Sequence, residues 1–219
     1  MGMMLYTFWR SQAAYRVRIA LALKGLQYER TYIDLIKGDQ HGDAYRAVHP
    51  GGVLPTLIDG DGPPLVESLA ILEYLEEKQP SPPLLPADLR LRAHARGIAQ
   101  MMVVDTHPYI VPRVRKQLAE RFGIDDAGWS DWLRHWFAAG SQSVETLLSK
   151  DGRTGKFCCG DEPTVADICL VPHLVSGMVL KVLDVAGYPT CKRIFDTCME
   201  LDAFSATHPR KQPDFPPDH

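Results

Sequence analysis

The sequence predicts an α/β domain followed by an all-helical domain, and three observations support this. Strand-like and helix-like segments alternate over the first 80 residues. Residues 80–86 (PSPPLLP) then have the composition of a linker. Beyond that linker the apolar residues recur with helical spacing, and we find no convincing strand. We therefore expect one domain at residues 1–80 and a second at residues 87–219.

The first domain is expected to begin with a strand, a helix and a second strand. Residues 4–8 form a short, mostly apolar segment, and residues 15–24 carry apolar side chains at helical spacing. Gly25 follows that helix as a typical cap. Residues 28–35 alternate as a second strand would. A polar connection with one helical turn, around residues 43–47, leads to the next strand.

A proline interrupts the third strand, at residues 53–57 (VLPTL). Proline cannot donate to a strand ladder, so Pro55 is expected at an edge, a bulge or a tight turn. An X-Pro bond in such a place is also where a cis peptide bond is most often found. Residues 65–66 then return as a short strand to a helix that starts at Glu67 and Ser68. This order of strands and helices predicts a small thioredoxin-like sheet.

The second domain is expected to consist of helices. Its longest helical segments are at residues 88–123, 129–150 and 188–201. The first of them is interrupted at Pro108 and Pro112, because proline cannot continue a helix ladder. Thr164 and Asp167 have the spacing of a capping box, which predicts another helix start. The tail after residue 207 is expected to be irregular.

Composition argues against several classes of function. The formal net charge of −3 gives no overall field for nucleic acid or an acidic membrane. No apolar run approaches the roughly 18 residues of a membrane span, and we expect no secretory signal at the start. The cysteines all lie in the second half of the chain: Cys158, Cys159, Cys169, Cys191 and Cys198. They lack the spacing of zinc ligands, which predicts reduced thiols in a cytoplasmic protein without a metal site.

Two features of the first domain suit a small peptide ligand. Beside Pro55, the backbone of Leu54 is left free to pair with an extended peptide, which would add itself as an extra strand. The helix start at Glu67 and Ser68 offers unpaired backbone N–H groups and a hydroxyl, which together suit a carboxylate. A free strand edge beside an anion-binding helix start therefore predicts a site for a small peptide.

Ser11 stands where the first strand passes into the first helix. A thiolate placed there is stabilised by the positive end of the helix and by a hydroxyl hydrogen bond. No cysteine precedes Cys158, so the sulfur would have to arrive with a cosubstrate. The simpler interpretation is that Ser11 only caps the helix.

Several motifs together resemble the zeta-class glutathione transferases, the family of the maleylacetoacetate and maleylpyruvate isomerases. They run from Leu5 to Asp214: FWRSQAAYRVRIALALKG, LPTL, ESLAILEYLEE, PPLLP, DTHP, GDEPTVADICLVP and HPRKQPD. The resemblance implies the glutathione transferase fold, with a thioredoxin-like N-terminal domain and an all-helical C-terminal domain. It also implies glutathione as cofactor, a small electrophilic substrate, a homodimer and a place in aromatic amino acid catabolism.

The resemblance further implies roles for individual residues. Ser11 would hydrogen-bond the glutathione sulfur, and Arg10 and Arg16 would serve the carboxylates of the substrate. The glutathione-binding set would be Ser11, Gln12, Ala13, Gln40, Leu54, Pro55, Glu67, Ser68 and His107. In the family reaction the thiolate adds to a cis double bond, the resulting single bond rotates, and expulsion of the thiolate leaves the trans isomer.

The chain also departs from the family pattern. Gln12 and Ala13 replace a Ser-Cys pair, and Ile110 and Val111 replace a pair of asparagines. Val179 stands near the position of a family arginine. Two further interpretations therefore stay open: a zeta-like transferase that conjugates or dehalogenates apolar electrophiles, and a non-catalytic binding module. Arg113 and Arg115 are candidates to replace a lost carboxylate contact, but solvated helix charges are the interpretation that we favour for them.

Overall fold

The computed structural model describes residues 2–217, so residues 1, 218 and 219 of the expected domains lie outside the described residues. The chain divides into two compact units, Met1–Leu84 with Leu201–His219, and Leu85–Glu200. The division after Leu84 falls within the expected linker. The C-terminal segment, which we expected in the second domain, packs with the first unit instead. Buried hydrogen bonds explain this, because the Tyr15 hydroxyl donates to Phe204 O at 2.9 Å.

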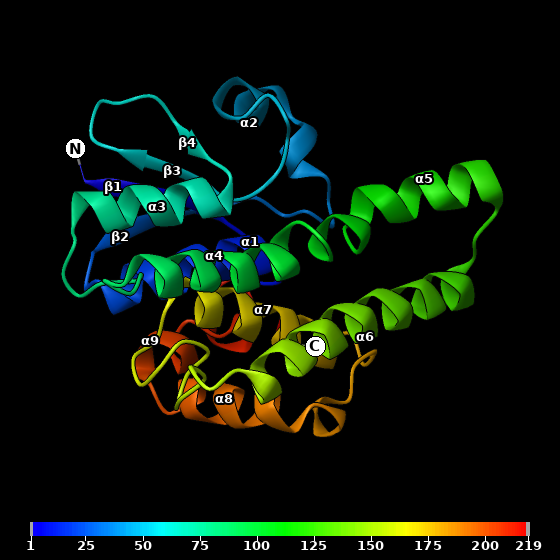
Figure 1. Cartoon of the computed structure of the whole chain (residues 1–219). Helices are drawn as coiled ribbons and strands as arrows, with labels where there is room; N and C mark the ends of the chain where they lie inside the picture. The colour runs from blue at the N-terminus through cyan, green and yellow to red at the C-terminus, as the bar shows by residue number, and fades with distance from the viewer. Residues whose placement is uncertain (1, 218–219) are drawn as a thin grey trace. The chain divides into compact units, whose positions relative to one another are not determined.

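The first unit contains a four-stranded sheet and three helices of more than five residues. The strands are β1 (Met3–Thr7), β2 (Tyr28–Tyr32), β3 (Thr56–Asp59) and β4 (Leu65–Val66). They lie in the order β2-β1-β3-β4, with β1 parallel to β2 and the other pairs antiparallel. The helices are α1 (Gln12–Leu23), α2 (Asp43–Val48) and α3 (Ser68–Lys78). Figure 1 shows α3 alongside the strands, and the predicted order of elements is confirmed.

The third strand begins later than expected. Pro55 lies just before β3, which starts at Thr56 and runs between β1 and β4. This follows from the missing N–H of proline, which excludes Pro55 from the ladder of an interior strand. The Leu54–Pro55 peptide bond is cis, as the sequence led us to expect.

Helix α1 is the most buried helix of the first unit. Residues 12–21 are all buried, and α1 packs against α3 and against the short helix α9 (Asp202–Ser205). The helix ends at Leu23 with Lys24 as its C-cap residue, and Gly25 follows with φ of +65°, a left-handed conformation that favours glycine. The predicted glycine cap is therefore confirmed.

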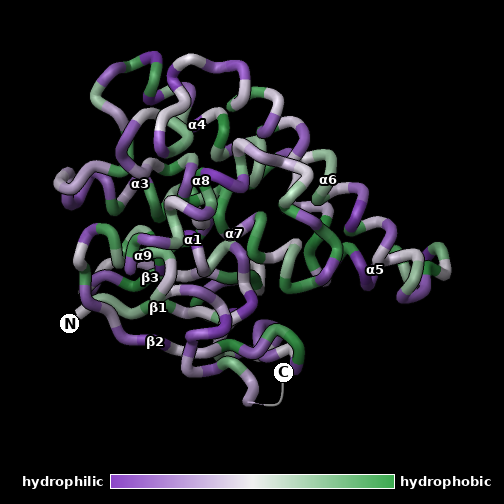
Figure 2. Tube along the Cα trace, turned by 90° about the horizontal axis from the view of Figure 1, so that it is seen from below, coloured by the Kyte–Doolittle hydropathy of each residue, from purple (hydrophilic) through white to green (hydrophobic). Residues whose placement is uncertain are grey.

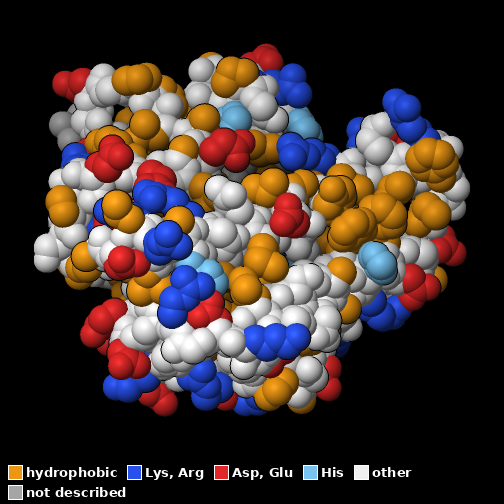
Figure 3. Space-filling view, viewed as in Figure 1, with side chains coloured by type: hydrophobic (Ala, Val, Ile, Leu, Met, Phe, Trp, Pro, Cys, Tyr) orange, Lys and Arg blue, Asp and Glu red, His pale blue; other side chains and the backbone are white. Residues whose placement is uncertain are grey.

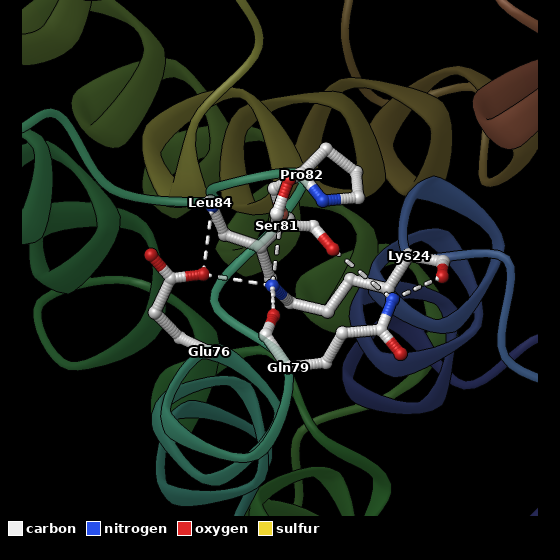
Figure 4. Close-up of polar contacts among 6 residues, drawn as sticks. All are labelled: Lys24, Glu76, Gln79, Ser81, Pro82 and Leu84. Atoms are coloured by element: carbon white, nitrogen blue, oxygen red, sulfur yellow. Dashed lines mark hydrogen bonds and ion pairs between the residues drawn. The ribbon is translucent and has the colours of Figure 1, made fainter.

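A buried ion pair fastens the end of α1 to α3 and to the start of the linker (Figure 4). Lys24 Nζ lies 2.8 Å from Glu76 Oε2, and it also donates to the carbonyls of Gln79 and Pro82. The same Glu76 oxygen accepts the Leu84 N–H at 2.8 Å. All three ammonium donors of Lys24 are thus used within the first unit.

The second unit is helical, apart from one isolated bridge between Phe157 and Gly160. Its helices are α4 (Leu89–Val103), η2 (His107–Tyr109), α5 (Pro112–Phe122), α6 (Asp126–Lys150), α7 (Val165–Val179), η3 (Val185–Gly187) and α8 (Pro189–Met199). Helix α7 is buried along most of its length, whereas α5 mixes hydrophilic and hydrophobic residues (Figure 2). The capping box of Thr164 and Asp167 at the start of α7 is confirmed.

Three further expectations concern the proline interruptions, the C-terminal tail and the cysteines. The interruptions at Pro108 and Pro112 are confirmed, since Pro108 lies in η2 and Pro112 begins α5. The tail that we expected to be irregular contains one 3-10 turn, η4 (Pro209–Lys211). All five cysteines are free and buried. Among the described residues, no helix combines the length and apolar character that a membrane crossing requires.

Candidate active site

Three loops of the first unit lie at the same end of the strands, where β1 ends, β3 begins and β4 ends. Thr56, the first residue of β3, pairs with Tyr6 of β1 and with Val66 of β4. The loop after β1, the segment before β3 and the residues after β4 therefore leave the sheet side by side. These segments carry most of the site residues that the sequence predicted.

Ser11 caps α1 in the first of these loops. Its Oγ accepts the Ala14 N–H at 3.2 Å, and its own N–H donates to Phe8 O at 3.0 Å. A serine hydroxyl has one hydrogen and two lone pairs, so Ser11 can cap the helix and still donate its O–H to a ligand. The capping role that we considered as the simpler interpretation is present, and it leaves the donor available.

The next two residues begin α1, and both are buried. The first N–H groups of a helix have no intrahelical acceptor, which applies to Gln12 and Ala13 here. The Gln12 side chain is only 6% exposed, and neither its Nε2 nor its Oε1 has a hydrogen-bond partner among the described residues. An unpaired buried amide costs about 1–3 kcal/mol. The start of α1 thus carries several polar groups suited to a partner from outside the chain.

Arg16 connects the starts of α1 and α3. Its guanidinium is fully buried, and Nη1 donates to Ser68 Oγ at 3.0 Å. This hydrogen bond ties the second turn of α1 to the start of α3. We expected Arg16 to serve a substrate carboxylate. Its position instead favours support of Ser68.

The start of α3 has an unusual backbone conformation. Glu67 has φ of +66°, and its side chain makes no capping hydrogen bond. A residue other than glycine in this region costs about 1–3 kcal/mol and is most often found at functional sites. Ser68 follows as the first residue of α3 and is buried. The N–H groups of this helix start therefore remain suited to an anion.

Tyr45 holds the segment around Leu54 and Pro55. Its hydroxyl donates to Val53 O at 2.6 Å and lies 2.9 Å from Thr56 Oγ1. Burial raises the pKa of Tyr45 to about 12, so this hydroxyl stays protonated at neutral pH. Leu54, between these two anchors, lies outside the ladder of β3. Its backbone is thus positioned for the pairing that the sequence suggested.

Gln40 lies close to the same segment. It belongs to the 3-10 helix η1 (Asp39–His41), and its carbonyl oxygen is 2.8 Å from the point where a Cβ on Gly52 would be. Gly52 has φ of +58°, so both its conformation and this close approach require glycine. The loop that carries Gln40 is thereby brought against the loop that leads to Leu54.

Arg10 precedes Ser11 in the first loop. It is half-buried, and its guanidinium lies 5.8 Å from the centre of the Trp9 ring. His107, which we expected to contact glutathione, belongs to the second unit and begins η2. The group assembled in the first unit therefore consists of the other predicted residues: Arg10, Ser11, Gln12, Ala13, Arg16, Gln40, Leu54, Pro55, Glu67 and Ser68.

The second unit explains two departures from the family pattern. Ile110 packs against a core cluster of α6 formed by Trp129, Leu133 and Phe137. Hydrophobic side chains gather here between α5 and α6 (Figure 3). Val111 is the N-cap of α5 and has no capping side chain.

The structure also shows the surroundings of the two arginines and the valine that the sequence singled out. Arg113 is exposed, and Arg115 forms an exposed ion pair with Asp126. Val179 is the last residue of α7 and is half-buried. The pairing of Arg115 favours the interpretation of this arginine as a solvated helix charge.

Sequence reasoning missed the residues that support the site. Gly52 was visible as half of a glycine pair before the proline strand, and such a pair signals a turn. Tyr45 carried no local signal, because its partners Val53 and Thr56 are supplied by the fold. The same is true of Arg18, whose partners Phe8, Trp9 and Thr207 are also supplied by the fold.

Comparison with known proteins identifies the family. Residues 5–83 match the model of the glutathione S-transferase N-terminal domain. The chain is 41% identical over 212 residues to a maleylpyruvate isomerase of Ralstonia sp., which covers 97% of this chain and 99% of the relative.

Two solved structures extend this similarity to the fold. A maleylacetoacetate isomerase from Methylobacterium extorquens AM1, solved with bound malonate and GSH, has a TM-score of 0.95 at 48% identity and covers 97% of this chain and 99% of its own. The holo structure of a maleyl pyruvate isomerase, a bacterial glutathione S-transferase in the zeta class, has a TM-score of 0.93 at 39% identity, with coverage of 97% and 100%. The predicted fold class and family are confirmed, and the chain belongs to the zeta-class glutathione transferase and maleylacetoacetate isomerase family.

Proposed function

We propose that this protein is a glutathione-dependent cis–trans isomerase of the maleylacetoacetate or maleylpyruvate type. The observation that carries the proposal is the pair of helix starts joined by the Arg16–Ser68 hydrogen bond. The start of α1 supports a thiolate, and the start of α3 supports a carboxylate. A γ-glutamyl tripeptide with a central thiol has both groups. The unpartnered Gln12 carboxamide also fits a ligand at this place.

Different residues of the first unit would bind different parts of the ligand. Ser11 would donate its hydroxyl hydrogen to the sulfur, and the Leu54 backbone would pair with the cysteinyl peptide group. Ser68 and the N–H groups of α3 would hold the γ-glutamyl carboxylate, with Arg16 adding a positive charge behind Ser68. Gln40 would reach the glycyl end. Glutathione, when bound, supplies a thiolate that adds reversibly to a conjugated double bond.

The substrate would be a small electrophile with two carboxylates. Each carboxylate needs a cation or several donors when it leaves water. Arg10 is the half-buried cation in the Ser11 loop, and we propose it as one anchor. The relative from Methylobacterium extorquens was solved with malonate, itself a dicarboxylate.

A specific observation keeps a second candidate function in view. Ile110 is part of an apolar cluster rather than a polar one, and Val111 offers no side-chain donor. These residues suit a transferase that conjugates or dehalogenates apolar electrophiles.

The test is to incubate the purified protein with glutathione and, separately, maleylpyruvate, maleylacetoacetate and a chlorinated α-halo acid. We expect isomerisation of the maleyl compounds. In Arg10→Met the KM for these compounds should rise more than kcat falls, because the guanidinium binds ground and transition states alike. Turnover of only the halo acid would favour the second candidate. Retention on a glutathione column without any turnover would support a binding module instead.

Homodimer formation and a cytoplasmic location are part of this proposal. The family resemblance supports the dimer, and five buried free thiols support a reducing compartment. Light scattering at micromolar concentration tests the dimer directly. A monomer under those conditions would contradict it.

A further inference from the structure

The C-terminal segment of the chain contacts the loop that carries Ser11. The backbone N–H of Trp9 donates to Asp214 Oδ2 at 2.7 Å, although the two residues are 205 positions apart. The Phe215 ring meets the Trp9 ring edge-on, with centroids 5.0 Å apart. Trp9 itself is almost fully buried. All these residues belong to the first unit.

Arg18 holds the same loop from inside the unit. Its guanidinium is fully buried and donates to Phe8 O at 3.2 Å and to Trp9 O at 3.3 Å. Its Nε donates to Thr207 O, also at 3.3 Å, so Arg18 joins the loop to the C-terminal segment. Burial lowers the pKa of Arg18 to about 10, which still leaves it charged at neutral pH.

These contacts determine where Ser11 lies. The Trp9 peptide is held at its N–H by Asp214 and at its C=O by Arg18. The Ser11 N–H donates to Phe8 O, the carbonyl that Arg18 also holds. Ser11 has no hydrogen bond of its own to the C-terminal segment among the described residues. Ser11 is therefore connected to that segment only indirectly, through the hydrogen bonds of Trp9 and Phe8.

We propose that Asp214 is a positioning residue for Ser11, which holds the loop so that the Ser11 hydroxyl meets the ligand sulfur. The inference rests on the proposed function only in taking that sulfur to be the thiol of glutathione. Asp214 does not touch the ligand in this proposal: its Oδ2 accepts the Trp9 N–H, and its Oδ1 is buried without a hydrogen-bond partner among the described residues. Its loss would let the loop move and take Ser11 with it, while the start of α3 stays in place.

A structural role alone predicts a different result. The C-terminal segment also contacts α1 through the hydrogen bond between Tyr15 and Phe204, so loosening the segment as a whole lowers stability. A merely stabilising contact would change the unfolding midpoint without changing the acidity of a bound thiol. The acidity of the bound thiol reports on Ser11 and separates the two roles.

The experiment compares Asp214→Ala, Asp214→Ser and Asp214→Asn in the full chain. Alanine removes the acceptor, serine is too short to reach the Trp9 N–H in its present place, and asparagine keeps an oxygen acceptor. Asp202→Ala is the matched control, because Asp202 is an exposed carboxylate in the same segment. The readouts are the pKa of bound glutathione, followed by the ultraviolet absorbance of its thiolate, and the affinity for glutathione.

We expect Asp214→Ala and Asp214→Ser to raise the pKa of the bound thiol by about one unit, a tenfold loss of thiolate stabilisation. Asp214→Asn should recover most of this effect, and Asp202→Ala should match the wild type. If alanine prevents folding, serine and asparagine still decide the question. An unchanged thiol pKa in folded Asp214→Ala or Asp214→Ser would overturn the proposal, as would a wild type that does not lower the thiol pKa. Failure of the wild type to isomerise maleyl compounds, with its thiol pKa lowered, would reject the proposed function alone.

Discussion

Two buried polar clusters of the first unit differ in how completely their hydrogen bonds are made. At the end of α1, Lys24 uses all three of its ammonium donors, on Glu76, Gln79 and Pro82. At the start of the same helix, the Gln12 carboxamide has no partner among the described residues. Folding normally satisfies buried polar groups, so a cluster that stays incomplete is expected to be completed by a ligand. The residues at the end of α1 thus hold the fold together, whereas Gln12 at its start belongs to the candidate site.

The backbone conformation also differs between the complete cluster around Lys24 and the incomplete cluster at the helix starts. Near Lys24 the helix ends with the glycine cap at Gly25, which requires no strain. At the start of α3, Glu67 adopts a positive φ although it has a side chain. A chain selected for stability alone would place glycine there. The strained residue Glu67 and the unpaired carboxamide of Gln12 thus both belong to the candidate site.

The largest expected effect comes from breaking the complete cluster. Lys24→Met should lower the free energy of unfolding by about 3–5 kcal/mol, because it leaves the Glu76 carboxylate buried without its cation. Denaturant unfolding followed by circular dichroism measures this. Lys78→Met is the control, since Lys78 forms an exposed pair with Asp59 and its loss should change the midpoint little. Equal effects of the two substitutions would show that the buried ion pair contributes no more to stability than the exposed one.

Ser11→Ala tests the incomplete cluster through rate rather than stability. Losing one hydrogen bond to a charged sulfur should cost about 1.5–3 kcal/mol in the transition state, or roughly ten- to a hundredfold in kcat/KM. The loss of the N-cap should lower stability by about 1 kcal/mol. Steady-state kinetics and titration of the bound thiol check the first effect. If both stay at wild-type values, another donor such as Gln12 holds the sulfur.

Gln12→Met should stabilise the free protein, whereas most core substitutions lower stability. It changes the volume of the side chain little. It removes an unpaired amide, so the free protein should gain up to about 1 kcal/mol of stability. Glutathione binding should weaken by about tenfold at the same time, because the ligand loses a partner. Thermal unfolding without ligand and calorimetry with glutathione measure the two effects. A destabilised variant with unchanged affinity would show that the carboxamide is bonded within the protein.

The last expected effect is a dependence of stability on pH, and it concerns the half-buried side chain of His208. Its Nδ1 accepts the Arg210 N–H, and burial, helped by Arg210, lowers the pKa of His208 to about 4. Between this value and the ordinary pKa of about 6.5, the unfolded chain binds more protons than the folded chain. Stability should therefore be complete above about pH 6.5 and fall as the pH drops towards 4.

His208→Asn should flatten this dependence between pH 7 and pH 5, where most carboxylates stay ionised. Urea unfolding at several pH values provides the measurement. The exposed His135, changed to Asn, serves as the control. An identical slope in His208→Asn and the wild type would mean that other groups cause the loss of stability in acid.

The sequence by itself determined the order of elements and the family, and it predicted most residues of the candidate site. These depend on local physics: the spacing of apolar residues, the missing N–H of Pro55 and the hydroxyl of Ser11 at a helix start. The capping box of Thr164 and Asp167 was predictable for the same reason, since its partners lie three residues apart. Such features need no knowledge of which distant segments meet.

Only the tertiary structure decided the partners that lie far apart in the chain. It placed Arg16 against Ser68, 52 residues away, and Asp214 against Trp9, 205 residues away. It also moved the C-terminal segment into the first unit, where we had expected a continuous second domain. The physical reason is that a buried arginine or carboxylate takes whatever partner the packed core brings within about 3 Å, and no local pattern encodes that choice.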